Sequence, residues 1–255
     1  MVTTRKNGSL YTRMDGKVAT VEFGHPASNS FVAELLLRLT DTINELSENK
    51  GISVVLLKSE GQKAFCAGAS FDELLEVSNL EEGKEFFSGF AHVINAMRKC
   101  KKVIVGRVHG KTVGGGVGLA AACDYVYSNE NAAIKLSELS IGIAPLVIAP
   151  AVERKIGTAA LAELSLAPTE WKSAYWAQEK GLFSKVFSTP EEMDKELDFF
   201  IHQLASYNPD ALTEWKKALW QGTAHWDTLL TERAELSGKL ALSEFTRNAL
   251  SKFKK

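Results

Sequence analysis

The stretch GKTVGGGVGLAAACD, residues 110–124, places three consecutive glycines directly before an alanine-rich run. Ordering a glycine costs more conformational entropy than ordering any other residue, so three together indicate a position where side chains would obstruct something. The apolar run VIVGRVHG that precedes the glycines predicts a buried strand, and GVGLAAAC predicts a helix. The glycines therefore occupy a strand-to-helix turn, and a fourth glycine, Gly118, lies on the first turn of that helix.

The segments before this turn predict a β-hairpin, a helix and a further strand. SLYTRM and KVATVEF flank Asp15-Gly16 with alternating apolar and polar residues, which predicts a β-hairpin. Residues 29–50 carry apolar side chains three or four positions apart, which indicates a helix with one buried face. These side chains are Phe31, Leu35, Leu39, Ile43 and Leu46. ISVVLLKS, residues 52–59, then predicts a strand buried on both faces, so we expect an α/β fold.

A second glycine loop, FCAGASFDEL at residues 65–74, also joins a strand to a helix. Ser70 is placed to cap this helix and Glu73 to complete a capping box, which leaves the amide of Ala69 outside the helix. The amides of residues 114–116 lie at the N-terminus of the other helix, where the helix dipole favours negative charge. If the two loops face one another, their amides form an oxyanion hole. The alternative is that the glycines only permit tight packing of a helix on a sheet.

Composition narrows the classes of partner. The 255-residue chain has a net charge of −1 with acids and bases interspersed, so we expect no nucleic-acid partner. Cys66, Cys100 and Cys123 are widely spaced, with no histidine at ligand spacing, which indicates free thiols and no metal site. The N-terminal segment has no signal-peptide core, and no apolar run reaches membrane-spanning length. We therefore expect a cytoplasmic protein that does not bind a membrane.

The second half of the sequence is mainly helical in pattern. DYVYS, AIKLSE and SKVFS predict short strands, and helical spacing prevails from about residue 146. TPEE and NPD mark two helix starts, with Thr189 and Asn208 as the caps. Aromatic residues in this region are expected to pack onto the body of the same or a neighbouring subunit. They include Trp215, Trp220, Trp226 and Phe245.

Four segments together resemble the crotonase superfamily, the enoyl-CoA hydratase/isomerase family. They are KAFCAGAS, GRVHGKTVGGGVGLAAACDYVYS, LSELSIGIAP and AYWAQEKGLFSKVF, and they occur in the family's order and spacing. The resemblance implies a ClpP/crotonase-like fold of repeated β-β-α units with a helical C-terminal region. It also implies an acyl-CoA-binding catalytic core over residues 1–190 and a helical region over residues 191–255 that serves packing and oligomerisation. An acyl-CoA thioester as substrate, no cofactor other than its coenzyme A, and a homotrimer or hexamer are further implications.

The resemblance also implies roles for individual residues. Ala69 and Gly115 fall where the family places the two amides that bind the thioester oxygen, and Glu138 falls at a catalytic carboxylate. The expected substrate-binding positions are Ala67, Gly68, Ser70, Gly114, Gly116, Gly118 and Pro145. Glycine beside Gly115 would let the thioester lie close to the backbone. Hydratases of the family use a second glutamate at the position of Gly118, and that carboxylate is absent here.

Several reactions remain open on these residues. A single carboxylate suits Δ3-Δ2 enoyl-CoA isomerisation, in which Glu138 moves a proton from C2 to C4 while the amides hold the enolate. Hydration of a short or branched enoyl-CoA, such as methylglutaconyl-CoA, would need a replacement acid. The candidates are Asp72, Glu73, Glu76 and His92. Decarboxylation of an acyl-CoA would need the oxyanion hole alone. The alternative from a different functional class is a catalytically weak protein that binds acyl-CoA.

Overall fold

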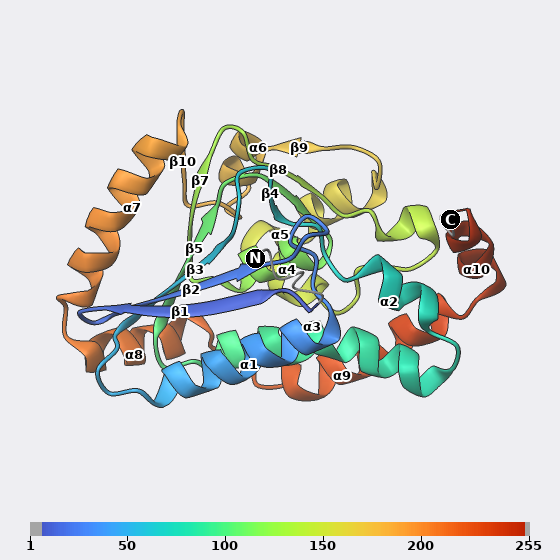
Figure 1. Ribbon diagram of the computed structural model, residues 1–255, viewed down its shortest axis with the longest axis horizontal. Helices are drawn as coiled ribbons and strands as arrows, with labels where there is room; N and C mark the ends of the chain where they lie inside the picture. The colour runs from blue at the N-terminus through green and yellow to red at the C-terminus, as the bar shows by residue number, and fades with distance from the viewer. Residues whose placement is uncertain (1–6, 253–255) are drawn as a thin grey trace, which may run out of the picture.

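Two sheets form the centre of the computed structural model, which describes residues 7–252 (Figure 1). The strands of the larger sheet are β1 (Ser9–Asp15), β2 (Val18–Gly24), β3 (Val54–Ser59), β5 (Val103–Val108), β7 (Tyr125–Asn129) and β10 (Lys185–Phe187), in that spatial order. The strands of the smaller sheet are β4 (Ala64–Cys66), β6 (Lys111–Val113), β8 (Ala133–Lys135) and β9 (Lys172–Ser173). The N-terminal segment in which no signal-peptide core was expected begins with residues 1–6. These residues lie outside the described residues.

The chain alternates between the two sheets. Strands β3, β5 and β7 enter the larger sheet, and the strand that follows each of them, β4, β6 or β8, enters the smaller one. Pairing is parallel throughout, except between β1 and β2 and between β8 and β9. The predicted fold of repeated β-β-α units is therefore confirmed.

Helices cover both faces of the larger sheet. They are α1 (Ala33–Glu48), α2 (Phe71–Glu76), α3 (Leu80–Lys99), α4 (Gly115–Ala122), α5 (Ala149–Leu166), α6 (Ala174–Glu179), α7 (Pro190–Ala205), α8 (Pro209–Leu219), α9 (Trp226–Ala241) and α10 (Glu244–Ser251). Side chains alternate between the two faces of a strand, so Val18 and Val21 of β2 lie on opposite faces of the sheet. Val21 packs in the core with α1, and Val18 packs against α7. Figure 1 shows α1, α3 and α9 running side by side along one edge of the molecule.

The predicted helix caps are present, with one difference. Ser70 accepts a hydrogen bond from the amide of Glu73, and Thr189 and Asn208 cap α7 and α8. The carboxylate of Glu73 does not return to its own helix to complete a capping box. It instead accepts a 2.9 Å hydrogen bond from the amide of Ala33, the first residue of α1. A carboxylate there is favoured by the dipole of the longer helix.

The C-terminal aromatic residues divide into two groups. Trp220 and Trp226 are buried against each other with an interplanar angle of 89°, as expected. Trp215 and Phe245 are 64% and 68% exposed, so a single chain does not bury them. Packing of these two on a neighbouring subunit stays a prediction.

The three cysteines have the free thiols expected from the sequence. Cys66, Cys100 and Cys123 are free and buried. Between residues 7 and 252, none of the helices combines the length and hydropathy that crossing a bilayer requires.

Packing around Gly118 leads to a stability prediction. A Cβ on Gly118 would lie 2.5 Å from Cγ2 of Ile148, at the junction of α4 and α5. Alanine usually favours a helix over glycine by up to about 1 kcal/mol, but overpacking a core costs about 1–3 kcal/mol. We expect Gly118→Ala to lower the free energy of unfolding, and to lower it less in an Ile148→Ala background. Urea denaturation of the parent, the two single variants and the double variant measures the cost of Gly118→Ala in each background. Equal costs in the two backgrounds would contradict this packing.

Candidate active site

Three loops meet at one edge of the smaller sheet. Strand β6 pairs in parallel with β4 on one side and with β8 on the other. Parallel strands end at the same edge, so the segments that follow them lie together. These segments are residues 67–70 after β4, residues 114–115 after β6 and residues 136–138 after β8. The resemblance placed its three expected catalytic residues, Ala69, Gly115 and Glu138, on these same segments.

The amide of Ala69 is oriented by a short bridge to Phe31. The amide of Phe31 donates to the carbonyl of Gly68 over 2.8 Å, and the amide of Ser70 donates to the carbonyl of Phe31 over 2.7 Å. Successive amides of an extended chain point in opposite directions. The N–H of Ala69 therefore points away from Phe31, and Ala69 lines the cavity described below.

The amide of Gly115 begins helix α4. Gly114 precedes it with φ 53° and ψ −119°, a conformation that a residue with a side chain rarely adopts. The first amides of a helix have no intrahelical acceptor, and no side chain caps α4. A Cβ on Gly68 would lie 3.6 Å from the amide nitrogen of Gly115, so the two glycine loops are in contact distance of one another.

The space beside each glycine is taken by the protein's own side chains. A Cβ on Gly114 would lie 2.8 Å from Oε1 of Glu138, and one on Gly115 would lie 2.3 Å from the ring of Phe90. A Cβ on Gly116 would meet Cys66 at 2.7 Å. The resemblance implied that glycine here lets a thioester approach the backbone. In the structure the glycines let a carboxylate, an aromatic ring and a neighbouring strand approach it.

Glu138 is half-buried at the start of the short 3-10 helix η1 (Glu138–Ile141). Its Oε2 is inaccessible to solvent and has no hydrogen-bond partner among the described residues. Burial without a compensating cation disfavours the ionised form, and it raises the pKa of Glu138 from the usual 4.5 to about 7. Such a carboxyl group can both accept and release a proton near neutral pH.

Later helices hold the Glu138 segment in place. The hydroxyl of Thr246 on α10 donates to the carbonyl of Gly142 over 3.0 Å. The guanidinium of Arg233 on α9 donates to the carbonyl of Leu146 over 3.1 Å. The amide of Ile143 donates to the carbonyl of Glu138 over 3.2 Å. The segment that follows the carboxylate is therefore held by hydrogen bonds to α9 and α10.

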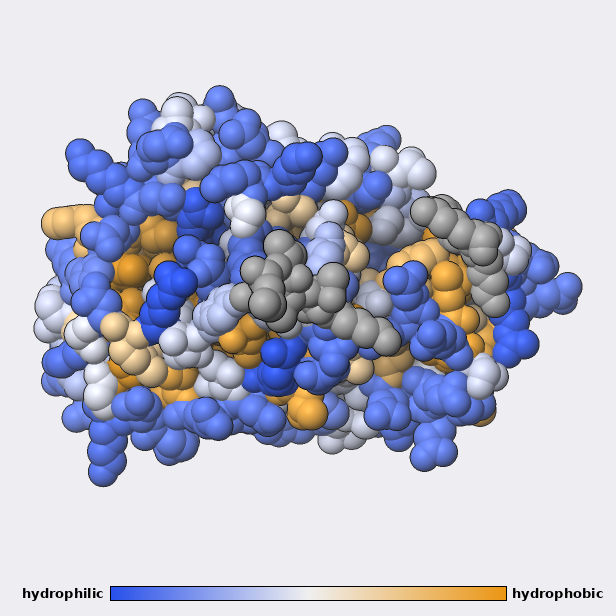
Figure 2. Space-filling model, viewed as in Figure 1, coloured by the Kyte–Doolittle hydropathy of each residue, from blue (hydrophilic) through white to orange (hydrophobic). Residues whose placement is uncertain are grey.

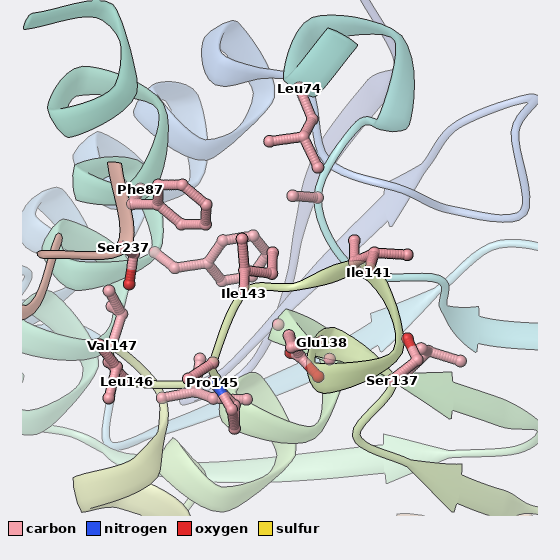
Figure 3. A pocket seen from close by; sticks show the side chains of 18 of the residues that line it. Leu74, Phe87, Ser137, Glu138, Ile141, Ile143, Pro145, Leu146, Val147 and Ser237 are labelled. Atoms are coloured by element: carbon pink, nitrogen blue, oxygen red, sulfur yellow. The ribbon is translucent and has the colours of Figure 1, made fainter. Parts of the chain in front are cut away.

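A cavity of about 330 Å³ lies over these loops, and Figure 3 shows many of its lining side chains. Its walls are mostly apolar. Besides the three loops, they come from Phe71, Leu74, Phe86, Phe87, Phe90, Val113, Ser140, Ile141, Ile143, Ala144, Leu146, Val147, Ile148 and Ser237. Figure 2 shows hydrophobic surface near α2 and α10, at the right of the view, where Leu74 packs in one cluster with Ile143. An apolar cavity with a few polar groups suits an acyl chain with one reactive end.

The cavity brings together most of the residues expected from the sequence. Glu138, Ala69 and Gly115 line it, as do Ala67, Gly68, Gly114 and Pro145. Ser70, Gly116 and Gly118 are not among its lining residues: Ser70 caps α2, Gly116 packs on Cys66, and Gly118 lies behind Ile148. The phenylalanines of α3 and Ser237 of α9 were not expected. Their helical spacing is typical of core residues and carries no signal for a ligand site.

Glu138 is the only titratable side chain among the described residues that line the cavity. None of the four candidates for a replacement acid, Asp72, Glu73, Glu76 and His92, is in the lining. The carboxylate of Glu73 instead accepts a hydrogen bond from the amide of Ala33 at the start of α1. Within residues 7–252, no group of three or more His, Cys, Asp or Glu side chains is arranged to hold a metal ion.

Known proteins share both this sequence pattern and this fold. Residues 13–251 match the model of the enoyl-CoA hydratase/isomerase family. The chain is 27% identical to the peroxisomal Delta(3,5)-Delta(2,4)-dienoyl-CoA isomerase of Arabidopsis thaliana, over 75% of this chain and 72% of the relative. It is also 27% identical to the short-chain-enoyl-CoA hydratase of Clostridium acetobutylicum, over 94% of this chain and 92% of the relative.

A solved structure shares the whole architecture. The crystal structure of an enoyl-CoA hydratase from Bacillus halodurans superposes with a TM-score of 0.88 at 20% identity, covering 95% of this chain and 99% of that one. Together with the family match over nearly the full length, this makes the chain a member of the enoyl-CoA hydratase/isomerase family, with the crotonase fold.

Proposed function

We propose that the chain catalyses Δ3-Δ2 isomerisation of an enoyl-CoA, with Glu138 as the single base. The observation that supports this most strongly is the lining of the cavity, which contains one carboxyl group with a pKa near 7 and no second titratable side chain among the described residues. Isomerisation needs one group that removes a proton and returns it. Syn-hydration needs both a group that orients water and a proton source, for which a carboxylate pair is suited.

The proposed reaction moves one proton along an allyl system. Glu138 takes a proton from C2, and the electron pair of the broken C–H bond forms a C1–C2 double bond while the carbonyl π pair moves onto the thioester oxygen, which gives a dienolate. The amides of Ala69 and Gly115 donate to that oxygen, and being fixed in advance they need no reorganisation. Protonated Glu138 then returns the proton at C4, which leaves a C2–C3 double bond. No cofactor is needed beyond the coenzyme A of the substrate, since no electrons or groups leave the molecule.

We further propose a homotrimer or a hexamer located in the cytoplasm. Exposed Trp215 and Phe245 support assembly, because large aromatic side chains left uncovered in one chain are suited to burial by another.

Assays with two substrates test the proposed reaction. We expect turnover of a 3-enoyl-CoA and not of crotonyl-CoA. Glu138→Gln keeps the shape of the side chain and loses its basicity, so we expect activity to fall by about 10²–10⁴-fold while acyl-CoA binding stays close to that of the parent. Glu76→Gln, an exposed acid outside the cavity, is the matched control. Hydration of crotonyl-CoA by the parent, or retained isomerisation by Glu138→Gln, would refute the proposal.

The pKa of Glu138 predicts how activity depends on pH. The base acts only when ionised, and its raised pKa keeps the proton bound until pH rises through about 7. We expect kcat/KM to increase roughly tenfold per pH unit below pH 7 and to level off above it. Initial rates between pH 5.5 and 8.5 measure this profile, and a profile that is flat through pH 7 would contradict it.

The same group affects stability with a defined sign. Between pH 4.5 and 7 the unfolded carboxyl group ionises while the folded one keeps its proton, so the parent loses stability as pH rises. Glu138→Gln carries no such charge. We expect it to gain stability over the parent as pH rises from 5 to 7, by on the order of 3 kcal/mol at pH 8. Denaturant unfolding at several pH values measures the difference, and a difference that does not vary with pH would be the contrary result.

A further inference from the structure

Ser237 of α9 has a hydroxyl group that the proposed reaction does not use. The residue is 1% exposed, its Oγ has no hydrogen-bond partner among residues 7–252, and it lines the cavity. Buried hydroxyl groups are almost always hydrogen-bonded, because leaving one without a partner is costly. An unpartnered one in the wall of a ligand cavity therefore indicates a partner that the ligand brings.

Two other helical hydroxyl groups bond to the backbone one turn earlier. Ser88 of α3 donates to the carbonyl of Lys84 over 2.7 Å, and Thr231, also on α9, donates to the carbonyl of Asp227 over 3.1 Å. Such bonds are the usual arrangement for a serine inside a helix. Ser237 makes no such bond, so its hydroxyl group is free to point into the cavity.

A close helix crossing carries Ser237 to this position. Its neighbour Gly238 lies against Gly83 of α3, where a Cβ on Gly238 would come within 2.7 Å of the Gly83 backbone. Without side chains at these two positions, α9 approaches α3 closely enough to form part of the cavity wall. The two glycines thus make a serine from the C-terminal region a part of the acyl site.

The surroundings of Ser237 define the kind of group it would meet. Figure 3 shows Ser237 beside Phe87 and Val147, with Glu138 and Ser137 on the other side of the cavity. No Lys, Arg or His is among the described residues of the lining, so a ligand carboxylate would find no counter-charge. A neutral oxygen, such as a hydroxyl or a carbonyl, would satisfy Ser237 without burying an unpaired charge.

We propose that the hydroxyl of Ser237 binds a neutral oxygen on the acyl chain, remote from the carbons that react at Glu138. The preferred substrates are then acyl-CoA thioesters with a hydroxyl or keto group toward the distal end. This inference rests on the proposed function, because it assumes that the cavity binds an acyl-CoA. It adds a second polar contact, which selects among acyl chains that the apolar walls alone would bind alike.

The experiment compares matched ligands and matched variants. Dissociation constants are measured calorimetrically for butanoyl-, hexanoyl- and octanoyl-CoA and for their ω-hydroxy derivatives, none of which carries a double bond to react. At the chain length that reaches Ser237, we expect Ser237→Ala to weaken binding of the hydroxylated ligand relative to its alkyl partner by roughly five- to tenfold. Ser237→Cys keeps the size of the side chain, weakens its hydrogen bonding, and should shift the ratio in the same direction.

A helical serine outside the cavity provides the control. Ser88→Ala removes a hydroxyl group that is already bonded to the backbone, so the ratio should equal that of the parent. A ratio that Ser237→Ala and Ser237→Cys leave unchanged at all three chain lengths would overturn the inference, while binding of the alkyl ligands would leave the proposed function standing. If the parent bound none of the six ligands, the proposed function would fail, and this inference with it.

Discussion

Parallel pairing of β6 with β4 and β8 is the constraint on which the rest of the structure depends. It brings the ends of three short strands to one edge, and with them the two amides and the carboxylate that the proposed chemistry needs. The larger sheet does not contribute to the site directly. It supplies the buried core that positions the smaller sheet, because the pairs β3–β4, β5–β6 and β7–β8 each contribute one strand to both sheets. The geometry of the proposed site is thus a consequence of topology before it is a consequence of any one side chain.

Glycine at residues 114–116 makes this geometry possible at atomic scale. Each of these residues has a neighbour within 3 Å of the place where a Cβ would lie, and one of those neighbours is Glu138. The carboxyl group is thereby confined against backbone, out of solvent and without a hydrogen-bond partner among the described residues for its Oε2. The resulting rise in its pKa opposes folding when the group is ionised, and the same rise makes it a suitable base near neutral pH. Glu138 thus lowers the stability of the fold when it is ionised, and the proposed reaction depends on the same raised pKa.

Much of this could be predicted from local sequence. The strand-to-helix turns and the cap at Ser70 depend on short-range patterns, and the structure places them as expected. The role of Glu138 was implied by the resemblance and not by any local pattern. What could not be predicted depends on how distant elements cross. Glu73 was expected to close its own capping box, but it caps α1, whose start is 40 residues away. The resemblance implied that Gly118 stands where hydratases carry a carboxylate, and no local pattern indicates that Ile148 fills the space beside it.

The C-terminal helices show why the acyl site extends beyond the loops that the resemblance identified. Thr246 of α10 and Arg233 of α9 each bond to a carbonyl of the segment that follows Glu138, and Ser237 forms part of the cavity wall. The division at residue 190 into a catalytic core and a packing region stays a prediction, but these contacts link the two parts physically. The proposed reactive groups lie on the segments that follow β4, β6 and β8. Helices α3 and α9 form part of the wall opposite them, so substrate preference can change there while the proposed oxyanion amides and base remain in place.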